Sequence, residues 1–419
     1  MERRALQKLI ALSEEEGAFV VHGLSGTGKS FLLRKLTEVY GKRGRYILSD
    51  IAIDRELRDC LLSAAASEAP DSVIAALAEY FSMDRERILD TFFLFDGAES
   101  LGDSVSLLLG KHLPKRTAWA TNRIDRVSAE VRFCEVKPLS FVDFLSEIGH
   151  PEYADMIASH VEGNHPIPDL FSQEFDDLYY DYLLTGGFPQ AVETYLRDRT
   201  DISALRLTHA QIYANIACRL SEELPSDIKL SRLQALFKYY AGSSDVFHPG
   251  SIHRGMTRKD FAKEHRYLVH NGFLLPVATM REDAGAKSTT DVDNYSLTDC
   301  GLYRFLQNDY DSFYNTDREE MPYSVLRNAL YCACHSSDTP VVRWESSRNL
   351  RLPLLLSESR IFVTFTSEQT RRSRAAGAFK ALHPGWENYH ITDVKAKEKS
   401  PDHKIQWFEF EQTLMSKKR

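Results

Sequence analysis

The feature that most constrains the fold is a glycine-rich octapeptide near the start of the chain. Residues 23–30 read Gly-Leu-Ser-Gly-Thr-Gly-Lys-Ser and fit the pattern G-x-x-x-x-G-K-[ST]. A short apolar run, Ala18–Val21, precedes the octapeptide, and residues 31–36 follow it with helical spacing of apolar side chains. Strand, glycine loop and helix in this order form a cradle for phosphate groups, because glycines let backbone N–H groups turn inward and the helix presents its positive end.

Each residue type in this loop has a part in phosphate binding. We expect Lys29 to reach the β- and γ-phosphates and the hydroxyl of Ser30 to bind Mg²⁺. The residues predicted to bind the nucleotide are Gly23, Ser25, Gly26, Thr27, Gly28, Lys29, Ser30 and Phe31.

A second strand is predicted over residues 91–95, and it ends at Asp96. Four apolar residues ahead of an acid are typical of a central strand that delivers a carboxylate to the magnesium ion. Asp96 is therefore predicted to share Mg²⁺ with Ser30. The alternative is an aspartate that only caps the end of a strand.

The segment after Asp96 resembles the Walker B motif of the AAA+ and STAND classes of P-loop ATPases. The AAA+ form has a glutamate directly after the aspartate, where this chain has Gly97. The STAND form has two acids three and four positions after the aspartate, where this chain has Glu99 and Ser100. The resemblance implies ATP and Mg²⁺ as cofactors and Glu99 as the residue that positions water, with hydrolysis slow or absent.

A third strand, predicted over residues 117–120, leads into Thr121-Asn122-Arg123. The Thr-x-Arg form resembles the sensor arginine of STAND proteins, which implies that Arg123 detects the γ-phosphate through its forked donors. Arg126 and Arg132 are alternatives for a sensor or a finger into a neighbouring subunit, and a surface arginine remains the other interpretation.

Two further segments extend the resemblance along the chain. Ser140 is predicted to cap a helix that buries Phe141, Phe144 and Leu145. Pro-Leu-Ser-Phe at 138–141, followed by Gly-Gly-Phe-Pro at 186–189, resembles bacterial and archaeal P-loop ATPases that carry a C-terminal domain of unknown function. The resemblance implies that Pro189 faces the nucleotide, whereas the residues alone indicate a helix-breaking turn.

Residues 230–240 and 259–271 have helical spacing and are followed by a predicted hairpin with a long polar tip over 280–293, a pattern typical of a winged helix. A basic cluster, interrupted by Asp260 and Glu264, is either a phosphate-contacting surface or a solvated helix face. Its members are Arg254, Arg258, Lys259, Lys263 and Arg266. Asp-Cys-Gly-Leu at 299–302 resembles a further motif of the same ATPases.

The family usually ends in a fold like the PD-(D/E)xK nucleases, which the resemblance places after about residue 317. The expected acidic positions fall near Arg327 and Leu352, and no metal cluster is evident, so cleavage is not expected. Arg371–Arg374 and the segment Lys395–Arg419 are either a polymer-binding surface or solubilising surface.

Composition limits the partners of the chain. The 419 residues carry a net charge of −8, so DNA contact would depend on local patches such as the winged helix and the basic tail. Six scattered cysteines, Cys332 and Cys334 among them, are predicted to be core thiols. No apolar run approaches the roughly 18 residues of a membrane span, and Met1–Arg4 lacks the apolar core of a signal peptide, so we expect a cytoplasmic protein without membrane contact.

The predicted architecture is α/β: a P-loop NTPase domain over 1–137 with a parallel sheet flanked by helices, a helical lid over 138–205, a winged helix over 206–316 and a degenerate nuclease-like α/β domain over 317–419. The predicted function is an ATP-dependent conformational switch acting with or without DNA. The alternative is a nucleotide-bound scaffold that assembles with itself or a protein partner, for example in stress or phage defence.

Overall fold

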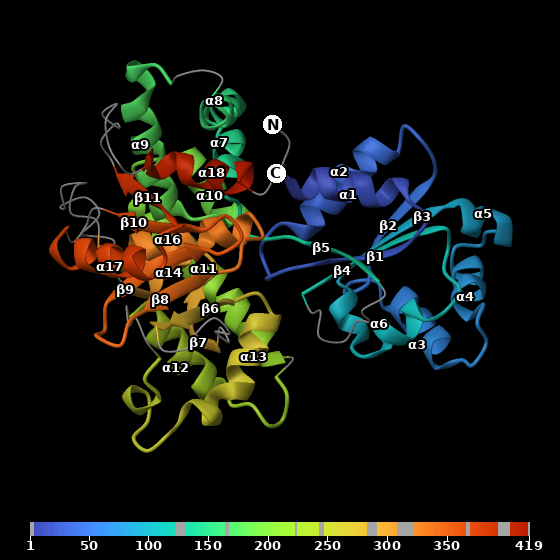
Figure 1. Ribbon diagram of the computed structural model, residues 1–419. Coiled ribbons are helices and arrows are strands. Elements are labelled where there is room, and N and C mark those ends of the chain that lie inside the picture. The colour runs from blue at the N-terminus through green and yellow to red at the C-terminus, as the bar shows by residue number, and fades with distance from the viewer. Residues whose placement is uncertain are drawn as a thin grey trace. The chain divides into compact units, whose positions relative to one another are not determined.

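A computed structural model of the chain describes residues 4–122, 131–163, 167–222, 224–242, 247–282, 291–307, 322–365, 369–392 and 403–417. The chain divides into two compact units, Glu2–Lys137 and Pro138–Arg419 (Figure 1). None of the described helices is long and apolar enough to cross a membrane.

The first unit is a five-stranded parallel sheet with helices on both faces (Figure 1). Its strand order is β2-β3-β4-β1-β5. The elements are α1 (Arg4–Glu14), β1 (Gly17–His22), α2 (Lys29–Tyr40), β2 (Tyr46–Asp50), α3 (Arg55–Ala66), α4 (Ser72–Tyr80), α5 (Arg85–Asp90), β3 (Phe92–Asp96), η1 (Ala98–Leu101), α6 (Ser104–Leu109), β4 (Arg116–Thr121) and β5 (Arg132–Glu135).

The near-continuous apolar sequence of the strands follows from burial of both sheet faces. On β3, Phe92 and Leu94 point to the core under α1 and α2, while Phe93 and Phe95 point to the core under α3, α4 and α6. Trp119 of β4 is fully buried against Phe95, with ring centroids 4.5 Å apart. The predicted parallel sheet flanked by helices is confirmed.

The second unit combines helices with a seven-stranded mixed sheet of order β12-β11-β10-β9-β8-β6-β7. Its helices are α7 (Phe141–Glu147), α8 (Pro151–Val161), α9 (Asp169–Thr185), α10 (Pro189–Arg197), α11 (Ile202–Glu222), α12 (Leu230–Ala241), η2 (Pro249–Ser251), η3 (Arg258–Phe261), α13 (Ala262–His270), α14 (Cys300–Gln307), α16 (Tyr323–Ser336), α17 (Gln369–Leu382), η6 (Trp407–Glu409) and α18 (Phe410–Ser416). Its strands are β6 (Leu274–Arg281), β7 (Asp291–Leu297), β8 (Val342–Glu345), β9 (Arg351–Leu356), β10 (Ile361–Phe365), β11 (Glu387–Thr392) and β12 (His403–Gln406).

Several predicted elements of this unit are present. Ser140 caps α7 by accepting the N–H of Asp143 at 3.2 Å, and Phe141, Phe144 and Leu145 are buried as expected. Residues 274–297 form the antiparallel hairpin β6–β7, preceded by α12 and α13. However, β6 also pairs in parallel with β8, so that one continuous sheet joins the hairpin to the strands of the C-terminal segment.

Candidate nucleotide-binding site

The glycine loop connects the carboxyl end of β1 to the first residue of α2. Gly23, Gly26 and Gly28 have φ angles of 150°, 87° and 92°, a region that favours glycine. A Cβ on Gly23 would collide with the carbonyl oxygen of Val136 in the strand-end segment beside it. Thr27 steadies the turn, because its Oγ1 donates to the carbonyl of Leu24 at 2.9 Å. The loop backbone therefore requires the glycines that the motif supplies.

Lys29 places a buried positive charge inside this loop. Its Nζ donates to the carbonyl oxygens of Gly23 at 2.8 Å and Leu24 at 3.1 Å. Burial, assisted by the charge of Lys29, lowers the pKa of the neighbouring His22 to about 4. His22 is therefore neutral at pH 7, and Lys29 is the charged group that the loop offers to an anion.

The first turn of α2 supplies the other predicted contacts. Ser30 is half-buried on this turn, and the helix begins at Lys29 with no acidic residue in its first turn. The unpaired amides of a helix N-terminus attract phosphate oxygens. Phe31 is 50% exposed and lies under the ammonium group of Lys35, 5.7 Å from the ring centroid.

Asp96 stands at the carboxyl end of β3, the same edge of the sheet from which the loop leaves β1. Its Oδ1 accepts the N–H of Gly97 at 3.0 Å. In a parallel sheet of this kind, ligands bind beyond the carboxyl ends of the strands. The hydroxyl of Ser30 and the carboxylate of Asp96 are hard oxygen donors of the type that Mg²⁺ prefers, so these residues fit the predicted ion.

Gly97, directly after Asp96, lies where a larger residue would not fit. Its φ is +70°, and a Cβ there would lie 2.9 Å from the Cβ of Ala52 and 3.1 Å from Oδ1 of Asp50. Asp50 ends β2 directly beside Asp96 in the strand register, and its Oδ1 accepts the N–H of Ala52 at 2.9 Å. Asp50 was not predicted as a site residue, although an acid at the end of a strand is the same pattern that singled out Asp96.

Glu99 lies in η1, half-buried, and is held by the end of the neighbouring strand β4. Asn122 donates from Nδ2 to Oε1 of Glu99 at 3.0 Å. The hydroxyl of Ser100, which replaces the second STAND acid, instead donates to the carbonyl of Gly97 at 2.8 Å. Asn122 belongs to the polar strand end where a sensor of the γ-phosphate was expected, and its contact with Glu99 could not be foreseen from the sequence.

Arg123 and Arg126 lie outside the described residues. Arg132 lies in β5 and donates to Oε2 of Glu15 at 2.6 Å and to the carbonyl of Glu16 at 3.1 Å. Both acceptors precede β1, at the edge of the sheet opposite the glycine loop. The alternative that Arg132 senses phosphate in this unit therefore does not fit its position.

The strand order places β4 between the loop strand β1 and the aspartate strand β3. The first unit has the P-loop NTPase fold. No protein-family model and no curated protein matches the chain.

Solved structures similar to this chain include P-loop ATPases. The Walker-type ATPase paby2304 of Pyrococcus abyssi is 14% identical, with a TM-score of 0.45 over 73% of this chain and 95% of that one. The STAND protein PH0952 of Pyrococcus horikoshii, which has a tetratricopeptide repeat sensor, is 14% identical with a TM-score of 0.29; the match covers 80% of this chain and 45% of that one. AMPPCP-bound DnaA from Aquifex aeolicus is also 14% identical with a TM-score of 0.29; the match covers 64% of this chain and 84% of that one.

Three motifs of the second unit meet at one point. The N–H of Leu139 donates to the carbonyl of Gly187 at 2.6 Å, and Oδ2 of Asp299 accepts the N–H of Gly187 at 2.6 Å. A Cβ on Gly186 would lie 2.5 Å from Oδ1 of Asp299. Pro189 follows as the first residue of α10. The glycines of the Gly-Gly-Phe-Pro motif therefore have a packing role within this unit.

The basic cluster before the hairpin lies on the surface of the second unit. Arg254, Arg258, Lys259, Lys263 and Arg266 are all exposed. Lys263 forms an ion pair with Asp227, and the carboxylate of Asp260 accepts the backbone N–H of Thr257. In the basic tail, residues 393–402, 418 and 419 lie outside the described residues.

The positions expected to be acidic in a nuclease are not acidic. Arg327 lies on α16, and β9 and β10 read Arg-Leu-Pro-Leu-Leu-Leu and Ile-Phe-Val-Thr-Phe. Among the described residues, no group of three or more His, Cys, Asp and Glu side chains could hold a metal ion. Cys332 and Cys334 are both buried in α16.

Proposed function

We propose that the chain binds ATP with Mg²⁺ at the glycine loop and uses nucleotide binding, with slow hydrolysis, to drive a conformational switch. The observation that carries this proposal is the loop itself, with three glycines in glycine-specific conformations and the buried ammonium of Lys29 at the start of α2. The fold and the loop together support a nucleotide rather than a generic anion. The strand that ends in Asp96 reaches the same sheet edge as the loop, where its carboxylate could bind the Mg²⁺ that accompanies a nucleotide.

Each residue has a definite part in this proposal. Lys29 and the loop amides hold the phosphates, while Ser30 and Asp96 hold Mg²⁺, which neutralises phosphate charge when bound. Glu99 positions the attacking water, and Asn122 orients Glu99. The proposal also includes Arg123 as the sensor of the γ-phosphate and Pro189 as a residue that faces the nucleotide.

The absence of a glutamate at position 97 favours slow turnover and supports a second candidate function. In that alternative the chain is a nucleotide-bound scaffold that assembles with itself or with a protein partner. The exposed basic cluster around Arg258 supports the version of the switch that acts with DNA. Phosphate release measured with and without DNA, on a preparation of known oligomeric state, separates these versions.

Binding of a fluorescent ATP analogue tests the proposal. Lys29→Ala should weaken the affinity at least tenfold, because it removes the charge inside the loop. Lys42→Ala is the matched control, because Lys42 is exposed and lies just after the end of α2. Equal affinities for the two variants would refute nucleotide binding at this loop.

A further inference from the structure

The turn between α2 and β2 concentrates positive charge on the surface of the first unit. Residues 41–45 read Gly-Lys-Arg-Gly-Arg, with Tyr40 as the last residue of α2 and Tyr46 as the first residue of β2. We call residues 40–46 the basic turn. Because α2 has 12 residues and rises about 1.5 Å per residue, the basic turn lies about 18 Å from the glycine loop, at the other end of the helix.

The backbone of the basic turn is ordered by hydrogen bonds and ring contacts. The carbonyl of Tyr40 accepts the N–H of Arg43 at 2.7 Å and that of Gly44 at 3.1 Å. The ring of Tyr40 lies against Gly44, where a Cβ would be 3.3 Å from the Tyr40 hydroxyl, and Cε1 of Tyr46 would be 3.0 Å from a Cβ on Gly41. The basic turn therefore presents its side chains from a preorganised backbone, which lowers the entropic cost of binding a partner.

The side chains of the basic turn extend into solvent. Within the described part of the chain, Lys42 and Arg45 have no side-chain hydrogen bond or ion pair, and both are exposed. Arg43 donates from Nη1 to Oε1 of Glu14 at 2.9 Å, but the two side chains are 54% and 57% exposed, so that the pair is weak. Cations after a helix often serve its last carbonyls, yet here backbone N–H groups bind the carbonyl of Tyr40.

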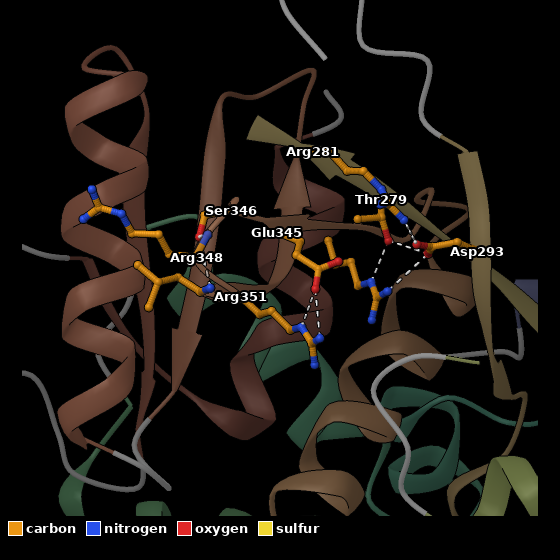
Figure 2. Close-up of polar contacts among 9 residues, drawn as sticks. Thr279, Arg281, Asp293, Glu345, Ser346, Arg348 and Arg351 are labelled. Carbon is orange, nitrogen blue, oxygen red and sulfur yellow. Dashed lines mark hydrogen bonds and ion pairs between the residues drawn. The ribbon is translucent and has the colours of Figure 1, made fainter. Parts of the chain in front are cut away.

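The arginines of the second sheet show the opposite arrangement. Oδ1 of Asp293 accepts from Arg343 at 3.2 Å, and its Oδ2 accepts from Arg281 at 3.1 Å (Figure 2). Oε1 of Glu345 accepts from Arg351 at 2.8 Å (Figure 2). Carboxylates of the same sheet engage these guanidinium groups, so we assign them a structural role and look for a partner at the basic turn instead.

The composition of the basic turn fits a single strand of nucleic acid. Guanidinium groups donate paired hydrogen bonds to phosphate oxygens, and two glycines between the cations leave room for a strand to approach the backbone. Tyr46 is 41% exposed and offers an aromatic ring beside these cations. Aromatic rings stack on unpaired bases, whereas the bases of a duplex are already stacked on one another. An acidic protein segment would engage the cations but would not need the ring.

We propose that the basic turn binds single-stranded nucleic acid, with Arg43 and Arg45 on phosphates and Tyr46 stacked on a base. The surface belongs to the first unit and shares no residue with the glycine loop or with the basic cluster around Arg258. The inference therefore does not rest on the proposed ATP binding.

Two variants of the full chain test this inference: Arg43→Gln/Arg45→Gln removes the guanidinium groups, and Tyr46→Leu removes the ring. The matched control is Arg55→Gln/Arg58→Gln, which removes the same charge from α3. This helix begins beyond the carboxyl end of β2, at the opposite edge of the sheet from the basic turn. Fluorescence anisotropy of a labelled oligothymidylate over a series of salt concentrations measures binding, with a duplex and polyglutamate as competitors.

The arginine double variant should bind the oligothymidylate about tenfold more weakly. Its salt slope should be smaller by about 1.4, because each phosphate contact of a single strand contributes about 0.7. Tyr46→Leu should bind at least about fivefold more weakly with an unchanged salt slope, since stacking involves no charge. The control should bind as the unsubstituted chain does.

The inference is wrong if the arginine double variant binds like the control, because the basic cluster around Arg258 is the same in both proteins. Equal losses for single strand and duplex, with no effect of Tyr46→Leu, would overturn the assignment to a single strand. Binding of polyglutamate that only the double variant loses would assign the basic turn to an acidic protein instead. Should the double variant have a lower thermal midpoint, Arg45→Gln alone repeats the test, since it keeps the pair of Arg43 with Glu14.

Discussion

Asp299 and Gly187 lie 112 positions apart in the sequence and are joined by a 2.6 Å hydrogen bond from the glycine N–H to Oδ2 of the carboxylate. The other oxygen, Oδ1, accepts the N–H of Leu302 at 2.7 Å. Asp299 is fully buried, and burial raises its pKa to about 6 although three backbone amides favour the charged form. A single side chain thus connects the Asp-Cys-Gly-Leu and Gly-Gly-Phe-Pro motifs.

Replacement of Asp299 by asparagine should destabilise the second unit by about 1–3 kcal/mol. The side-chain nitrogen of the asparagine would face a backbone N–H, and that buried N–H would lose its acceptor. Urea unfolding of the full chain measures the change. Asp201→Asn is the matched control: Asp201 is exposed and accepts only the N–H of Ala204, which asparagine also serves. Equal midpoints for both variants would show that the bond contributes little.

The local parts of the site could be predicted from sequence, whereas the parts that depend on strand neighbours could not. The loop from Gly23 to Ser30 and the strand that ends in Asp96 are encoded in consecutive residues, so pattern and chemistry coincide. Asp50 and Asn122 become site residues only because β2 and β4 flank β3, and hydrophobic periodicity carries no information about strand order.

The same reason explains what was missed in the second unit. The motifs containing Leu139, Gly187 and Asp299 were recognised separately, but their meeting depends on contacts between residues 48 and 112 positions apart. The hairpin β6–β7 was predicted from local alternation, yet its pairing with β8 depends on a parallel neighbour far along the chain. Parallel pairing between distant strands leaves no pattern within either segment.

Stability should fall as the pH is lowered from about 6.5 to 4, because burial lowers the pKa of His22, His209 and His265 to about 4 in the folded chain. The unfolded chain then binds more protons across this window, so protonation favours unfolding. Asp299, with its raised pKa, has the opposite effect over nearly the same window and offsets one of the three histidines.

Thermal midpoints measured at intervals between pH 4 and 7 check this prediction. His265→Gln should make the pH dependence of stability shallower by about one proton, because it removes one titrating imidazole. Glutamine can still accept from the hydroxyl of Tyr240, which lies 2.8 Å from Nε2 of His265. His112→Gln, at an exposed histidine paired with Asp71, serves as the comparison and should leave the profile steeper than His265→Gln does. A midpoint independent of pH over this window would contradict the assignment of neutral buried histidines.

Introducing a glutamate directly after Asp96 by Gly97→Glu should destabilise the first unit and yield no faster hydrolysis. The left-handed φ of +70° strains any side chain there, and the new Cβ would crowd Ala52 and Asp50. Gly110→Glu is the control, since Gly110 is exposed with a φ of −82° and a Cβ there makes only ordinary contacts. Calorimetry and phosphate release on both variants decide the matter, and a stable, faster Gly97→Glu protein would show that the loop can rearrange.

Glu99 and Asn122 should behave as one unit in hydrolysis. Glu99→Gln is expected to lower kcat at least about a hundredfold while leaving ATP affinity within about twofold, because a general base acts in the reaction and not in binding. Asn122→Ala should lower kcat without changing KM, and it should have little further effect in a Glu99→Gln background, since it acts through Glu99. Ser100→Ala is the control, because the Ser100 hydroxyl donates to the carbonyl of Gly97. Full turnover by Glu99→Gln would show that Glu99 takes no part in hydrolysis. Asp50, whose carboxylate lies beside Asp96 in the strand register, would then be the next candidate, and Asp50→Asn tests it by the same assay.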